Sequence, residues 1–188
     1  WEAMIPNMGI FALVRNLRNF DDVGISAEAR NKVKAKLSDP EVIRKSRMFP
    51  LRFFSAMVAN KSLHYHEALE EAINISVENV PALGGNTLIL CDLSGSMDWA
   101  ISDKSDVKRL APASIFAAAL AIKAEKAELV AFSETTAKVP FRKGQSVLLL
   151  TKDLVDAIPH AGTQTWQAVS RHFAAHDRVI IVTDEQSD

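Results

Sequence analysis

The sequence predicts an α/β protein in which a parallel sheet flanked by helices follows an α-helical segment. Residues 1–80 carry apolar side chains at helical spacing together with several helix-start signals. From about residue 86 onward, short apolar runs alternate with helical patterns, which is typical of a parallel sheet with helices on both faces. We therefore expect two domains, a helical segment over residues 1–80 and an α/β domain over residues 86–188.

Composition is that of a folded protein. The 188 residues are 48% hydrophobic and 24% charged, and the longest apolar runs fall far short of the ~18 residues that a membrane helix needs. The single cysteine, Cys91, rules out an internal disulfide and fits a reducing compartment. We expect a cytoplasmic protein without a membrane partner, and the start at Trp1 instead of Met leads us to expect a piece of a longer chain.

Charge is unevenly distributed along the chain. Residues 1–60 hold ten Lys and Arg against six Asp and Glu, whereas residues 61–188 hold twelve against seventeen. A basic first part beside an acidic second part suggests two units with different partners. The alternative is ordinary charge on the surfaces of helices.

Helical signals dominate the first part of the chain. Ser26 and Asp39 are predicted N-caps, and Pro40 follows the second of them in the first turn. Pro50 begins a further predicted helix, with Phe54, Met57 and Val58 as its inward side chains. The first helix has one apolar face, made by Ile10, Leu13, Val14 and Leu17.

The second part combines strands and helices. We predict buried strands over residues 87–91, 128–132 and 178–182, and an antiparallel edge strand over residues 136–141. Three helices are predicted: one that begins near residue 111, one over residues 151–158 and one around residues 166–173.

Small polar residues follow two of these strands and precede one helix. DLSGS at residues 92–96 leaves the first strand, GTQT at residues 162–165 leads into a helix, and TDE at residues 183–185 leaves the last strand. Ligands bind at the carboxyl ends of the strands in such sheets, so we expect the three segments to meet there. The alternative is that DLSGS is simply a polar turn at the end of a strand.

The oxygen atoms in these segments suit a hard divalent cation. Carboxylate and hydroxyl oxygens favour Mg²⁺, with Mn²⁺ and Ca²⁺ as alternatives, and they do not suit zinc. No nucleophile elbow and no Gly-rich Lys-Ser/Thr phosphate loop occurs, so we expect a binding protein and not an enzyme. The predicted metal ligands are Asp92, Ser94, Ser96, Thr163 and Asp184.

The order of the three segments resembles the metal-ion-dependent adhesion site of von Willebrand factor A domains, over about residues 86–188. The resemblance implies a Rossmann-like A domain in which Ser94, Ser96 and Thr163 contact the metal directly. Asp92 and Asp184 would act directly or through water. A metal held in this way would keep a position open for a carboxylate of a protein partner.

The helical part is similar to another family. MIP at residues 4–6, ALVRNL at residues 12–17 and KSRMFP at residues 45–50 resemble the end of the helical-repeat, HEAT-like ring of TROVE proteins, the Ro-type family. In that family an A domain follows the ring directly. The resemblance implies binding of small noncoding Y RNAs and of misfolded RNA ends within a ribonucleoprotein.

Cationic residues of the helical part are the candidates for RNA contact, because they can neutralise phosphates. Phe49, Phe53 and Phe54 could stack on bases, although their spacing also suits a core. A rival hypothesis is a metal-dependent adhesion or scaffold module that grips a partner carboxylate, and another is a chelatase subunit whose ATPase activity lies elsewhere. The predicted RNA-binding residues are Arg15, Arg18, Arg44, Lys45, Arg47 and Arg52.

Overall fold

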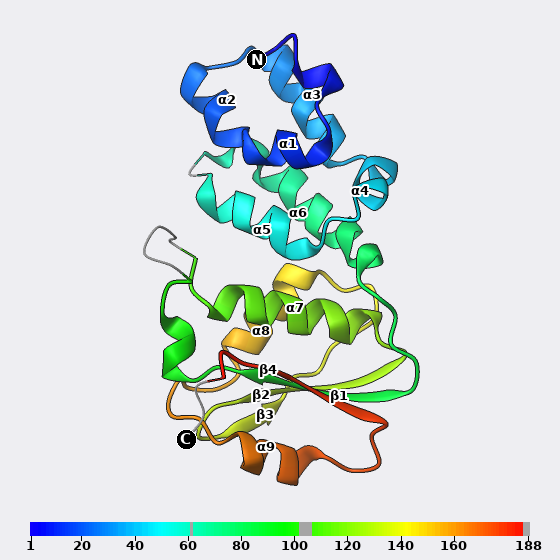
Figure 1. Ribbon diagram of the computed structural model, residues 1–188, viewed down its shortest axis with the longest axis vertical. Helices are drawn as coiled ribbons and strands as arrows, with labels where there is room; N and C mark the ends of the chain where they lie inside the picture. The colour runs from blue at the N-terminus through cyan, green and yellow to red at the C-terminus, as the bar shows by residue number, and fades with distance from the viewer. Residues whose placement is uncertain (61, 102–106, 186–188) are drawn as a thin grey trace. The chain divides into compact units, whose positions relative to one another are not determined.

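The computed structural model describes residues 1–60, 62–101 and 107–185. Contacts within the chain divide it into two compact units, Trp1–Asn79 and Val80–Asp188. The first unit is helical and the second contains a sheet with helices around it (Figure 1). Among the described residues, no helix is both long enough and apolar enough to cross a membrane.

The described part of the first unit is built from short helices. The α-helices of this unit are α1 (Ile10–Arg15), α2 (Leu17–Val23), α3 (Ala27–Leu37), α4 (Pro40–Ser46), α5 (Pro50–Ala59) and α6 (His66–Ser76). Single 3-10 turns are η1 (Ile5–Asn7), η2 (Leu63–Tyr65) and η3 (Val77–Asn79).

Two of these helices start where side chains cap them. The Ser26 hydroxyl accepts a hydrogen bond from the Ala29 N–H at 3.2 Å, at the start of α3. The Asp39 carboxylate accepts one from the Glu41 N–H at 2.8 Å, at the start of α4. Each cap satisfies a donor that the first turn of a helix leaves unpaired, and both predicted N-caps are confirmed.

Packing of the helical unit corrects the predicted face of α5. Phe53 is fully buried, whereas Val58 is 38% exposed, so the inward face is rotated from the prediction. Apolar residues occupy most positions of this helix, and its sequence therefore does not fix which face turns inward. The four apolar residues predicted to share one face of the first helix are all buried, although Asn16 separates α1 from α2.

The sheet of the second unit has four described strands in the order β3-β2-β1-β4. The central strand β1 runs parallel to β2 and β4, and β3 pairs antiparallel with β2. The bounds are β1 (Asn86–Asp92), β2 (Lys126–Phe132), β3 (Thr136–Lys138) and β4 (Arg178–Val182). The helices are α7 (Leu110–Lys123), α8 (Val147–Val155), α9 (Thr165–His172) and the 3-10 turn η4 (Gly95–Asp98).

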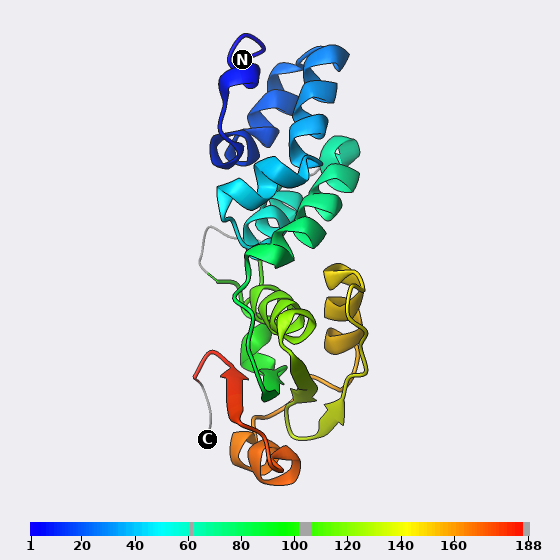
Figure 2. The same cartoon turned by 90° about the vertical axis from the view of Figure 1, so that its right-hand side faces the viewer.

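Helices cover both faces of this sheet. Helices α7 and α8 lie on one face and α9 lies on the other, and the two views agree on this layering (Figures 1 and 2). Under α9 the core joins Leu88 and Leu90 of β1 to Phe132 of β2. Cys91 is fully buried, and burial raises the pKa of its thiol to about 12, as expected of a core cysteine. The predicted fold class is confirmed.

Three element predictions need correction. Helix α8 begins at Val147, earlier than the predicted residue 151, because Ser146 caps it by accepting a hydrogen bond from Leu149 N–H at 3.4 Å. Strand β3 ends at Lys138 instead of reaching residue 141. Strand β4 was predicted to be buried, yet Ile181 is 40% exposed, since β1 is the one neighbour of β4 among the described strands.

Candidate cation site and nucleic-acid interface

Backbone hydrogen bonds bring two of the predicted segments together where the parallel strands end. The Gly95 N–H, in the loop after β1, donates to the Ala161 carbonyl at 2.7 Å. The Gln164 N–H donates to the Ser133 carbonyl, just beyond β2, at 3.0 Å. Residues 161–164 are thereby fixed beside the loop that follows β1.

Asp92 ends β1 and is fully buried. One carboxylate oxygen accepts the Ser94 N–H at 2.8 Å, and the other accepts the Thr183 hydroxyl at 2.7 Å. The second bond links the end of β1 to the segment that follows β4. Burial of a carboxylate is costly unless hydrogen bonds compensate, and these two donors provide that compensation.

A chain of side-chain hydrogen bonds continues from the first loop to Asp184. The hydroxyls of Ser94 and Ser96 are hydrogen-bonded at 3.2 Å, and Ser96 donates to one Asp184 oxygen at 3.2 Å. The other Asp184 oxygen accepts the Arg109 guanidinium at 2.7 Å. The Asp184 side chain is 9% exposed and the Arg109 side chain 31% exposed. The structure thus brings together four of the five predicted ligands.

Thr163 is the fifth predicted ligand. It lies half-buried in the segment that Gly95 and Gln164 hold at this edge of the sheet. Within residues 1–60, 62–101 and 107–185, no hydrogen bond joins its hydroxyl to the other four residues. The backbone therefore places Thr163 at the carboxyl edge of the sheet, but its side chain takes no part in the hydrogen bonds that link the other four residues.

The donor set fits a hard cation and not zinc. Across the described part of the chain, no group of three His, Cys, Asp or Glu side chains is placed to hold a metal ion. Any ion held here would therefore depend on hydroxyl oxygens as well as carboxylates, which suits Mg²⁺ or Ca²⁺.

Asp98 anchors the far end of the same loop. Its carboxylate accepts a hydrogen bond from Lys108 at 3.1 Å and is also hydrogen-bonded to His160 at 3.1 Å. Burial by itself would raise the pKa of Asp98, but these two partners outweigh burial and hold that pKa below its usual value. The loop is thus connected to residues on both sides of the site.

The predicted RNA-binding residues do not form one group. Arg44 forms an ion pair with Glu78 at 2.5 Å, which raises the pKa of the arginine through the hydrogen bond and the charge of its partner. Lys45 pairs with Glu41 at 3.2 Å, one helical turn away. Arg47 is exposed at the end of α4.

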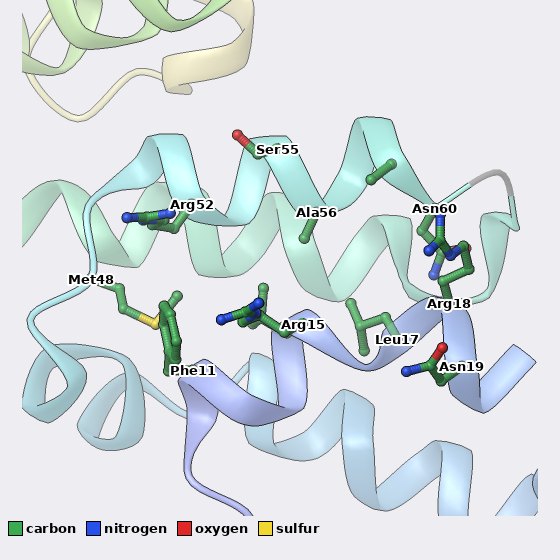
Figure 3. Close-up of a pocket in the computed structure, with 12 residues that line it drawn as sticks. Phe11, Arg15, Leu17, Arg18, Asn19, Met48, Arg52, Ser55, Ala56 and Asn60 are labelled. Carbon is green, nitrogen blue, oxygen red and sulfur yellow. The ribbon is translucent and has the colours of Figure 1, made fainter. Parts of the chain in front are cut away.

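The remaining three predicted cations line one pocket of about 500 Å³ between α1, α2 and α5. Arg15 and Arg18 reach it from α1 and α2, and Arg52 reaches it from α5 (Figure 3). None of the described residues that line this pocket is acidic. We call this hollow, defined by the three arginines, the arginine pocket.

Two residues of the arginine pocket were missed from the sequence. Phe11 is 48% exposed, and the Arg15 and Arg52 guanidinium carbons lie 5.6 and 6.0 Å from its ring centre. Asn60 is 4% exposed, and its side-chain N–H₂ has no hydrogen-bond partner among the described residues (Figure 3). The arginines at helical spacing from Phe11 could have indicated its role, but nothing in the sequence singled out Asn60.

Together these features define the class of protein: a helical unit with a basic pocket, followed by a Rossmann-like α/β unit with polar loops at the carboxyl edge of its sheet. The family model of the TROVE domain matches residues 1–64, which confirms the predicted resemblance for this segment. No curated protein sequence matches the chain.

A solved structure has the same fold. The chain is similar over 99% of its length to the crystal structure of the RO (RSR) protein of Deinococcus radiodurans, with a TM-score of 0.70 and 22% sequence identity. The chain covers 42% of that protein. This likeness agrees with the predicted order of a helical part followed by an α/β domain.

Proposed function

We propose that this chain belongs to an RNA-binding protein of the Ro type, and that the arginine pocket holds single-stranded RNA. The observation that carries the proposal is that Arg15, Arg18 and Arg52 line one pocket, with the exposed ring of Phe11 beside Arg15 and Arg52. The TROVE match over residues 1–64 supports it, because the pocket lies within that segment. Small noncoding RNAs and the ends of misfolded RNAs are the proposed partners, as the family resemblance implies.

The chemistry of the pocket suits an unpaired nucleotide. Guanidinium groups bind phosphate oxygens through paired hydrogen bonds, and the pocket presents three of them with no carboxylate among its described lining residues. A base can stack on an exposed aromatic ring with a stabilisation of about 1–3 kcal/mol. The Asn60 side-chain N–H₂, which has no hydrogen-bond partner among the described residues, offers a further donor to a phosphate or base oxygen.

Fluorescence anisotropy with a labelled single-stranded RNA tests this proposal. Changing Arg15, Arg18 and Arg52 together to Gln is expected to weaken binding by at least about tenfold. Arg44→Gln is the matched control, because that arginine is already paired with Glu78. Equal losses in the two variants would reject the arginine pocket as the RNA site.

Salt dependence gives a second, quantitative test of the same site. The logarithm of affinity for a single strand falls with the logarithm of salt concentration by about 0.7 for each phosphate neutralised. Three arginines therefore predict a slope near about −2, whereas all six predicted cations would give about −4. A salt-independent affinity, or no binding at low salt, would favour the rival adhesion module.

We also propose that the second unit holds a divalent cation, most simply Mg²⁺, at Asp92, Ser94, Ser96, Thr163 and Asp184. The supporting observation is the chain of hydrogen bonds that already gathers four of these side chains. An ion held there would offer an open position to an anionic oxygen, such as a carboxylate of a protein partner.

Calorimetric titration with Mg²⁺ and Mn²⁺ tests the cation site. Replacing Ser94 and Ser96 together by Ala is expected to abolish binding, because both hydroxyl ligands are lost. Ser170→Ala, at an exposed position of α9, is the control and should leave binding unchanged. Unchanged Mg²⁺ affinity in the double variant would reject this assignment.

A further inference from the structure

We propose that Arg109 is a built-in cation that competes with a divalent ion for Asp184. This inference rests on the cation site proposed above. The Arg109 guanidinium lies 2.7 Å from one Asp184 oxygen, while the other oxygen accepts the Ser96 hydroxyl. The charge that a metal ion would otherwise supply to this carboxylate is thus already provided by the chain.

The position of Arg109 is fixed by the loop that carries the serines. The Arg109 N–H donates to the Trp99 carbonyl at 2.9 Å, and Ala100 forms a β-bridge with Lys108. The guanidinium carbon also lies 5.8 Å from the centre of the Trp99 ring, within the range of a cation–π contact. Backbone and side chain together therefore direct the guanidinium toward Asp184.

Helix stability does not explain an arginine at this position. Arg109 is the N-cap of α7, makes no side-chain capping bond, and is followed by a first turn that lacks acidic residues. A cation at the positive end of a helix is unfavourable, so pairing with Asp184 must outweigh that local cost. The ion pair with Asp184 explains why an arginine occupies position 109. The same pair stabilises the loops that follow β1 and β4 when no ion is bound.

A divalent ion at the two serines would be repelled by this guanidinium. For a unit charge about 7 Å from a divalent ion in a water-like dielectric, the repulsion corresponds to roughly tenfold in affinity. Binding of the ion therefore requires Arg109 to leave Asp184 or to share it. Once displaced, the guanidinium beside the exposed Trp99 could meet an anionic group of a partner.

Mn²⁺ titration of the complete protein, read by calorimetry and by the electron paramagnetic resonance signal of free Mn²⁺, tests the competition. Arg109→Gln is expected to bind Mn²⁺ about tenfold more tightly than the wild type. Arg109→Lys keeps the charge and should stay closer to the wild type. Lys126→Gln removes an exposed cation at the start of β2, at the opposite edge of the sheet, and as the control it should change affinity by less than about twofold.

Thermal unfolding supplies a readout that does not depend on the affinity. Without metal, Arg109→Gln should melt at a lower temperature than the wild type. Saturating Mn²⁺ should raise the melting temperature of Arg109→Gln by more than it raises that of the wild type. Equal or weaker Mn²⁺ binding by a folded Arg109→Gln variant would overturn the competition while leaving the cation site in place. Absence of Mn²⁺ binding in every variant would reject the cation site itself.

Discussion

Removing the hydroxyl of Thr183 is the most direct test of how the carboxyl edge of the sheet is held together. Thr183→Val keeps the shape of the side chain but removes the donor that lies 2.7 Å from the buried Asp92 carboxylate. It also removes the acceptor of the Glu185 N–H at 3.1 Å. A hydrogen bond to a charged group contributes about 1.5–3 kcal/mol, and a buried acceptor left short of donors adds to the loss. We expect the second unit to lose about 2 kcal/mol of unfolding free energy.

Urea denaturation followed by tryptophan fluorescence measures this loss. In a Trp1→Phe background, both remaining tryptophans, Trp99 and Trp166, report on the second unit. With a slope of about 2 kcal/mol per molar urea, the midpoint should fall by about 1 M. Thr135→Val, at an exposed threonine of the β2–β3 turn, should change it by less than about 0.3 M. A Thr183→Val midpoint as close to the parent as that of the control would refute the reasoning.

Two further predictions concern the same unit. Burial by itself would raise the pKa of Glu128, but Lys138 and His172 together outweigh burial and hold that pKa below its usual value. This carboxylate therefore stabilises the fold above about pH 4.5, and the contribution is lost as pH falls through the lowered pKa. Glu128→Gln should therefore flatten the decline of melting temperature as pH falls below about 4.5, and an unchanged decline would contradict this. Gly85 has a φ of +76°, and a Cβ there would collide with the Asp177 carboxylate, so Gly85→Ala should cost more than about 1 kcal/mol in urea denaturation. Gly144→Ala is the control, because Gly144 has a φ of +78° but open space around it; an equal loss there would mean that backbone strain alone matters.

Predictions that depend on local or topological rules agree with the structure. Ser26 caps its helix through a bond that spans three residues, so the sequence itself contains both partners. Ser96 and Asp184 lie 88 residues apart, yet their approach was predictable. Parallel strands end at the same edge of a sheet, and the loops that follow neighbouring strands must therefore meet.

Predictions that depend on side-chain pairing across the fold could not be made in this way. Arg109 finds Asp184 across 75 residues, because a β-bridge beside Trp99 sets the course of the chain. Strand order does not determine that bridge. The same limit applies to the arginine pocket, where Arg52 approaches Phe11 through the packing of α5 against α1.

Charge shows most clearly that side-chain pairing cannot be predicted from sequence, because a sequence records the sign of each charged side chain but not its partner. A boundary at residue 60 makes the first part of the chain strongly basic, whereas the compact unit Trp1–Asn79 holds eleven Lys and Arg against ten Asp and Glu. Glu78, which neutralises Arg44, lies in the stretch that the earlier boundary leaves out. Net charge of the unit therefore does not favour RNA. What favours RNA is the placement of three arginines around a pocket whose described lining residues include no carboxylate, since a phosphate responds to the nearest cations more than to distant screened charges.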